Sequence, residues 1–205
     1  MKPLLAAAAL LVTAVLFFVA CSHSKRTDPE TVDVSIAPTG IRWGEYQGVA
    51  IPLTDQGPRT YTPAIAAGFA PAPAGAAVAA IVHTVRMSLA PDDAWAQIAA
   101  TELAPGPGKD AWATARVLFS LRGTAESATA PRVVGYRIYE YVPGVRSRVT
   151  VFTEYPDASL AATRTVVVWV GEDWRLQLPD PGSNAQQVES IRQIPDDAVR
   201  LEQTR

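Results

Sequence analysis

The sequence holds very little cysteine and histidine. Of its 205 residues, one is cysteine and two are histidine. A single cysteine, Cys21, cannot form an intramolecular disulfide, so the chain is not a disulfide-stapled secreted scaffold. His83 has no ligand-type partner three or four residues away, as helical metal sites require. These shortages predict no metal site and no cofactor, with His83 packed in the core and a ring nitrogen bonded to a backbone or hydroxyl group.

Long runs of one charge are also absent. The chain carries 18 basic and 20 acidic residues, for a formal net charge of -2, and the two signs are mixed along it. Nucleic-acid binding depends on a basic patch that neutralises phosphates. The composition therefore predicts that nucleic acid is not a partner.

Catalytic motifs are scarce. No Gly-x-Ser-x-Gly elbow occurs. One carboxylate, Glu140, falls on the same face of an expected strand as Tyr136 and Ile138, where a buried acid would serve as a general base. In the other arrangement Glu140 faces solvent or pairs with Arg148 across a hairpin. We expect this second arrangement and predict a protein that is not an enzyme.

What the sequence does have is an apolar start. Leu4 to Ala20 (LLAAAALLVTAVLFFVA) is long enough for a signal-peptide core or a minimal membrane span. It ends in Val19-Ala20-Cys21, which resembles the lipobox of bacterial lipoprotein signal peptides. The resemblance implies that Cys21 carries a diacylglycerol and becomes the new amino terminus. Phe18 departs from that motif, which usually has an aliphatic residue there.

The residues after the run leave a second possibility open. Lys25 and Arg26 also suit the flank of an uncleaved anchor, in which Cys21 only sits at the interface. Residues 1–21 are thus a signal peptide with a lipobox or a membrane anchor. Because a whole domain follows the run, both alternatives predict a protein at the extracytoplasmic face of the cell membrane, lipid-anchored or single-pass.

The rest of the chain divides by composition. Residues 22–40 are polar with little periodicity and predict a flexible spacer. Residues 41–180 are long enough for one domain with its own core. Residues 181–205 form a polar tail that docks on the domain or extends from it.

Helical spacing marks the first half of the domain. Val78, Val82 and Val85 share one face and predict a helix from Gly75 to Leu89. Two further helices are predicted, one from Pro91 to about Leu103 and one capped by Asp110 that runs to about Gly123. On the third helix, Trp112, Ala115 and Phe119 are expected to share one face.

From Arg132 the period changes to two, which is typical of strands with one buried face. Short turn sequences separate four such segments. Their alternating or apolar residues are Val134, Tyr136 and Ile138, then Val149, Val151, Thr153 and Tyr155, then Leu160 to Val170, and last Trp174, Leu176 and Leu178. The pattern predicts an antiparallel meander.

These elements predict an α+β fold with three helices packed on a curved four-stranded antiparallel sheet, after the N-terminal membrane segment. Their order over Gly75 to Pro179 resembles the nuclear transport factor 2-like cone. The resemblance implies a fold used by enzymes, by ligand-binding domains and by extracytoplasmic domains of conjugation and type IV secretion channels. The fold class by itself does not choose among these functions.

Aromatic residues give a candidate pocket. Trp95, Trp112 and Tyr136 would line an apolar cavity if the cone were hollow, whereas aromatic residues in one domain often simply fill a core. An empty cavity among the three would indicate a small-molecule or lipid-binding domain.

Three segments carry a second resemblance: GVAIPLTDQGPR at Gly48 to Arg59, GFAPAPAGAAVAAI at Gly68 to Ile81, and TRTVVVWVGEDWRLQLP at Thr163 to Pro179. They are similar to uncharacterised actinobacterial membrane-tethered proteins linked to conjugative or integrated elements. The resemblance implies a non-enzymatic assembly or accessory component of a conjugation- or secretion-type envelope apparatus, with protein partners in the envelope. The alternative is a tethered cone that binds a small molecule or lipid. The sequence does not identify the partner, the ligand, the oligomeric state or the host.

Overall fold

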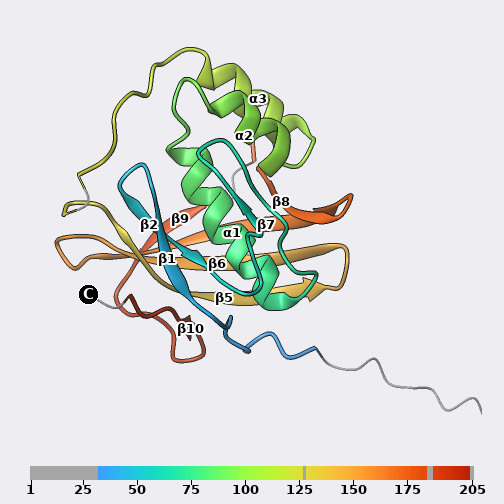
Figure 1. The fold of residues 1–205 in the computed structure, drawn as a ribbon. Coiled ribbons are helices and arrows are strands. Elements are labelled where there is room, and N and C mark those ends of the chain that lie inside the picture. Colours follow the sequence, from blue (N-terminus) through green and yellow to red (C-terminus); the bar gives the residue numbers. More distant parts are fainter. Residues whose placement is uncertain (1–31, 127, 184–186, 204–205) are drawn as a thin grey trace, which may run out of the picture. The chain divides into compact units, whose positions relative to one another are not determined.

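An antiparallel sheet dominates the fold (Figure 1). The computed structural model describes residues 32–126, 128–183 and 187–203. Four strands that follow one another along the chain form an antiparallel meander: β5 (Arg132–Val142), β6 (Arg146–Glu154), β7 (Leu160–Val170) and β8 (Asp173–Gln177). The structure thus confirms the four predicted strands. Their side chains alternate because successive residues of a strand point to opposite faces.

The sheet is larger than the sequence predicts. It has six strands, because β9 (Val188–Ile191) pairs with β7 and β10 (Val199–Arg200) pairs with β5. The expected fold class, three helices on a four-stranded cone of the nuclear transport factor 2-like type, is therefore wrong. The two added strands come from the polar tail and join the sheet by backbone hydrogen bonds. Backbone pairing does not require apolar side chains, so the sequence of the tail shows no alternation that would predict these strands.

Three helices cover one face and one end of the sheet. They are α1 (Pro73–Ser88), α2 (Trp95–Glu102) and α3 (Pro107–Arg116). The predicted first helix is confirmed, since α1 lies across the sheet and contacts β5, β6, β7 and β8 (Figure 1). Its alanines at 76, 77, 79 and 80 are fully buried and let neighbouring elements approach closely.

The bounds of the other helices differ from the prediction. Pro91 belongs to a turn, closed by the Ala94 N–H donating to its carbonyl, and α2 begins only at Trp95. Asp110 does not cap α3, which begins at Pro107 and ends at Arg116 instead of continuing toward Gly123. Proline at the first turn costs α3 no hydrogen bond, so the helix begins earlier than the cap prediction placed it.

Two short hairpins complete the domain. Strands β1 (Arg42–Tyr46) and β2 (Val49–Leu53) pair with each other, as do β3 (Thr60–Tyr61) and β4 (Ala66–Ala67). The β1–β2 turn uses positive φ at Gln47 and Gly48, which is the backbone form that two-residue hairpin turns need. Strand β2 packs against α1 and also contacts β5 of the sheet.

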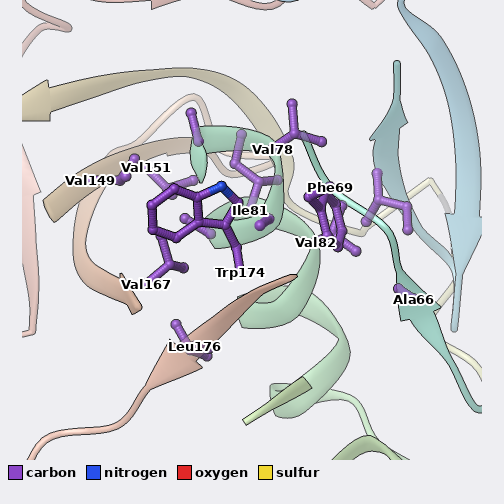
Figure 2. Close-up of a cluster of buried hydrophobic side chains, with 14 of the residues drawn as sticks. Ala66, Phe69, Val78, Ile81, Val82, Val149, Val151, Val167, Trp174 and Leu176 are labelled. Carbon is purple, nitrogen blue, oxygen red and sulfur yellow. The ribbon is translucent and has the colours of Figure 1, made fainter. Parts of the chain in front are cut away.

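The main core lies between α1 and the sheet (Figure 2). Trp174 is fully buried there, surrounded by Ile81 of α1 and by the strand residues Val149, Val151 and Val167. The Trp174 indole N–H donates to the Ala70 carbonyl at 2.9 Å, so the ring's polar group is satisfied in the core.

A smaller cluster lies on the opposite face of the sheet. Phe152 of β6 and Ala162 of β7 lie opposite each other and next in sequence to residues that face α1, so their side chains point to the opposite face of the sheet. Ile194 of the tail packs against them. The tail therefore protects one part of this outer face.

No helix among the described residues is long and apolar enough to cross a membrane. The apolar run from Leu4 to Ala20 and the predicted lipid attachment point Cys21 lie outside the described residues.

Candidate functional site

Three features carry the chemistry of the domain: a buried ionic cluster, a hollow on the outer face of the sheet, and an exposed apolar loop. The buried cluster joins His83 and Arg86 of α1 to Glu102 at the end of α2. The Arg86 Nε–H donates to both Glu102 oxygens, at 2.8 and 3.0 Å. The Ala66 N–H donates to Glu102 Oε1 at 3.0 Å, so the carboxylate receives donors from two elements.

His83 completes this cluster. Its Nδ1 lies 3.0 Å from Glu102 Oε2, and its Nε2 lies 3.0 Å from the Trp174 carbonyl oxygen. Both neighbours are acceptors, because Glu102 already receives N–H donors and a carbonyl has no hydrogen to give. His83 therefore bridges the Glu102 carboxylate and the Trp174 carbonyl oxygen.

The cluster is sealed from solvent. His83 is 1% exposed, and Arg86 and Glu102 are 0% exposed. The remaining Arg86 donors reach the carbonyls of Thr62 and Pro63, and its guanidinium lies over the Tyr46 ring at 4.4 Å. A substrate has no access to His83 and Glu102. The hydrogen bonds of the cluster connect α1, α2, β8 and the β3–β4 hairpin.

Burial also affects Tyr46. Its hydroxyl is buried and has no hydrogen-bond partner among the described residues. Loss of hydration on burial raises the pKa of Tyr46 to about 12.

The second feature, which we call the outer-face hollow, lies on the sheet face opposite α1. It has a volume of about 550 Å³ and is open to solvent. Residues of all four meander strands line it, together with residues between Leu178 and Ser183. Its lining includes Tyr139, Arg148, Thr150, Arg164, Gln177 and Asp180.

Carboxylates at its margin pair with both of its arginines. Arg148 Nε lies 2.9 Å from Glu140 Oε2, and Arg164 Nη2 lies 2.9 Å from Glu189 Oε2. Glu140 also accepts from Arg146 at 2.6 Å, and these guanidinium hydrogen bonds, led by that of Arg146, lower its pKa. Glu140 is therefore an ion-pair partner, as the second of the two sequence alternatives predicts.

The third feature, which we call the apolar tip, is Val117-Leu118-Phe119, directly after α3. These side chains are 63%, 82% and 52% exposed. The sequence predicts Phe119 on a longer third helix, on the same face as Trp112. That expectation is wrong, because α3 ends at Arg116 and the chain turns outward.

Arg116 and Asp92 hold this tip in place. The 3%-exposed Arg116 donates to the Phe119 carbonyl at 2.7 Å and to the Ala90 carbonyl at 2.9 Å. Asp92 accepts from Arg116 at 2.8 Å, from the Leu121 N–H at 2.9 Å and from the Ser120 hydroxyl. The Ser120 hydroxyl, then Arg116 and the Leu121 N–H, hold the pKa of Asp92 well below its ordinary value.

The predicted pocket residues lie in different surroundings. Trp95 and Trp112 meet edge to face with ring centroids 6.2 Å apart. Tyr136 lies in the core on β5, and its hydroxyl is 3.4 Å from the Ile36 carbonyl. Trp95 lines a shallow hollow beside the apolar tip, bounded by Asp92 and Arg116, whose lining includes neither Trp112 nor Tyr136.

Sequence reasoning found part of these features. It predicted a packed His83 bonded to a backbone group, which the contact with the Trp174 carbonyl confirms. It missed Glu102, because an acidic residue at the end of a short helix has the pattern of a solvated one. It also missed the outer-face hollow, although Tyr139, Arg148 and Gln177 occupy outward positions of their strands. Among the described residues, no group of three His, Cys, Asp or Glu side chains is placed to hold a metal ion.

Comparison with known proteins gives one match. A family model described as a domain of unknown function (DUF8175) matches residues 20–195. No curated protein and no solved structure matches the chain significantly. The matched range includes the buried cluster, the outer-face hollow and the apolar tip.

Proposed function

Because the chain belongs to the DUF8175 family, a domain of unknown function, the family supplies no activity, and we propose one from the surface of the domain. The protein is a non-enzymatic, membrane-tethered extracytoplasmic component that assembles with a protein partner in the cell envelope. Its setting is a conjugation- or secretion-type apparatus of an actinobacterial host element. The apolar tip is the docking surface, and its exposure is the observation that carries the proposal.

The tip has the properties of a binding anchor. Three adjacent apolar side chains, more than half exposed, leave an apolar surface in water unless a partner covers it. The centre of the Phe119 ring lies 4.8 Å from the Arg116 guanidinium carbon, and the Arg116 Nη1–H donates to the Phe119 carbonyl. A loop that is already ordered loses little conformational entropy on binding, so more of the burial energy appears as affinity.

The buried His83–Glu102 pair, sealed from substrate, supports action by binding and not by catalysis.

Photocrosslinking in cells tests the proposal. A photoreactive amino acid at Leu118 should give a discrete adduct with an envelope protein, and the same group at Val145, a 54%-exposed residue of the β5–β6 turn, should not. Phe119→Ser should abolish the adduct and leave the amount of folded protein unchanged. Adducts that are equal at both positions, or a cytoplasmic partner at Leu118, would contradict the proposal.

A second candidate function is that of a tethered domain that binds a small molecule. The outer-face hollow favours it, because ligand sites are open or enclosed cavities of about 300–1,000 Å³ with a few polar groups. This candidate and the docking of a partner use different surfaces, so one protein can do both.

A further inference from the structure

The outer-face hollow is built from side chains that alternate along neighbouring strands. Arg148 and Thr150 lie on β6, opposite Val166 and Arg164 of β7, and Gln177 of β8 lies opposite Val166. All of these side chains point to the face that α1 does not cover. The hollow is therefore a row of outward positions on the sheet, with a wall formed by Leu178, Pro179, Asp180 and Ser183 after β8.

Carboxylates offset the positive charges of the hollow. Its two arginines pair with Glu140 and Glu189, and Asp180 adds a further carboxylate to the lining. Phosphate and nucleic-acid sites need cationic groups whose charge is left over for the ligand. The balance of charge argues against an anionic ligand and favours a neutral one.

The polar groups suit a ligand with many hydroxyls. Guanidinium, amide and carboxylate groups each offer two adjacent donors or acceptors in a plane, which match two neighbouring hydroxyl groups. Arg148, Gln177 and Asp180 supply all three kinds within one hollow. Thr150 adds a buried hydroxyl that has no partner among the described residues, and a bond to it would satisfy this group.

An aromatic ring stands at the margin. Tyr139 is 58% exposed, and the Arg137 guanidinium lies 4.6 Å from its ring centroid. The cation limits the ring's motion and leaves much of its surface open to solvent. The C–H face of a sugar ring packs on such an aromatic surface, because the hydrogens are weakly positive and the ring face is negative.

We propose that the outer-face hollow binds a neutral carbohydrate chain, with Tyr139 as the stacking platform and Gln177, Arg148 and Asp180 as the hydroxyl-binding groups. An open site on a sheet accepts a segment within a longer chain, whereas a closed pocket would accept only an end. This inference rests on the second candidate function, and it does not depend on the docking of a partner at the apolar tip.

Titration of the full-length protein tests the inference. The protein is kept in a detergent without a sugar headgroup, and binding is followed by calorimetry with cellotetraose, maltotetraose and tetra-N-acetylchitotetraose as separate probes. At least one tetrasaccharide should bind saturably and more tightly than its monosaccharide. Tyr139→Ala should weaken that binding about tenfold or more, which corresponds to the loss of one aromatic contact and the ordering around it.

Matched variants keep the result specific. Tyr155→Ala removes another exposed tyrosine, 41% exposed in the β6–β7 turn, and should leave the affinity unchanged. Gln177→Ala should also weaken binding, at an unchanged melting temperature. Absence of binding by all three tetrasaccharides at millimolar concentration would overturn the inference, and so would tetrasaccharide binding that Tyr139→Ala and Gln177→Ala leave intact, or displacement by inorganic phosphate.

The two proposals fail separately. Phe119→Ser removes the apolar tip and should leave carbohydrate binding unchanged, while Tyr139→Ala should leave the crosslink at Leu118 unchanged. A variant that lost both properties would show that the two surfaces are not independent.

Discussion

At the scale of single residues, the hydroxyl of Tyr46 is a source of instability. It is buried without a partner among the described residues, and an unsatisfied buried polar group costs about 1–3 kcal/mol. Tyr46→Phe removes the hydroxyl and keeps the ring under the Arg86 guanidinium. We expect the variant to be more stable by about 1 kcal/mol in urea denaturation. A clear loss of stability would mean that the hydroxyl has a partner after all.

The same substitution changes the response to alkaline pH. The pKa of Tyr46 is raised by burial to about 12, whereas a tyrosine in an unfolded chain ionises near 10. Between these values the folded protein keeps a proton that the unfolded chain has lost, so stability is full below about pH 10 and falls as pH rises toward 12. Burial also raises the pKa of Tyr61, Tyr136 and Tyr141. Tyr46→Phe should therefore make the alkaline fall shallower without abolishing it, as denaturation at stepped pH would record.

Glu102 has the opposite role to Tyr46, because two buried donors depend on it. Glu102→Ala would leave the Arg86 guanidinium and the His83 ring without their carboxylate inside the domain. Breaking a buried ion pair from one side costs about 3–5 kcal/mol. Glu154→Ala, which removes the carboxylate of the half-exposed pair with Arg132, should cost less than about 1 kcal/mol. Equal losses for the two variants in urea melts would show that the buried cluster is not a structural tie.

At the scale of elements, the start of α1 shows how packing reverses an intrinsic preference. Alanine is favoured over glycine inside a helix by about 1 kcal/mol. A Cβ on Gly75, however, would lie 2.2 Å from the Ala70 carbonyl oxygen, a backbone atom that cannot move without its chain. We therefore expect Gly75→Ala to destabilise the protein by about 1–3 kcal/mol. Thr114→Ala on the exposed side of α3 should be neutral or slightly stabilising, and thermal melts of the two variants should move in opposite directions.

The helices and strands also show how much of the fold the sequence could predict. Alternation from Arg132 to Leu178 was sufficient for four strands, because each long strand buries one face. Strands β9 and β10 leave no such pattern, since β9 has no fully buried residue and β10 is two residues long. The end of α3 was missed because the apolar residues after it continue a helical spacing. Arg116, the last residue of α3, bonds to Ala90 and Asp92, which precede α2 and are not visible in the local pattern.

The candidate sites, like the strands and helices, were predictable only where a local sequence pattern was sufficient. Local pattern was enough to predict that His83 is packed, because apolar residues surround it along its own helix, and that Glu140 is paired, because Arg148 lies across one hairpin. Glu102 is buried only because Arg86 and His83 lie 16 and 19 positions earlier on another helix. The outer-face hollow needs the register of four strands, and single-sequence alternation gives faces but not registers.

At the scale of the whole molecule, the mode of attachment depends on Cys21. If Val19-Ala20-Cys21 is a lipobox, the mature chain begins at Cys21 with a diacylglycerol, and Cys21→Ser should block both lipid labelling and signal removal. The variant would migrate as the larger precursor. If Leu4 to Ala20 is a permanent helix, Cys21→Ser should change neither size nor membrane retention. Intact-mass measurement of wild-type protein from membranes decides, because a chain that still begins at Met1 without acyl mass contradicts the lipoprotein.

The strand β10 and the residues beside it join the two ends of the domain. The Leu201 N–H donates to Val134 on β5, and the Trp43 indole N–H donates to the Glu202 carbonyl at 3.0 Å, across 159 positions of sequence. The contact between Trp43 and Glu202 therefore forms only after residue 202 has left the ribosome. Contacts between such distant positions also slow folding. Until then β5 lacks its pairing with β10, so the nascent chain carries an unpaired strand edge at Gly135 and Tyr136.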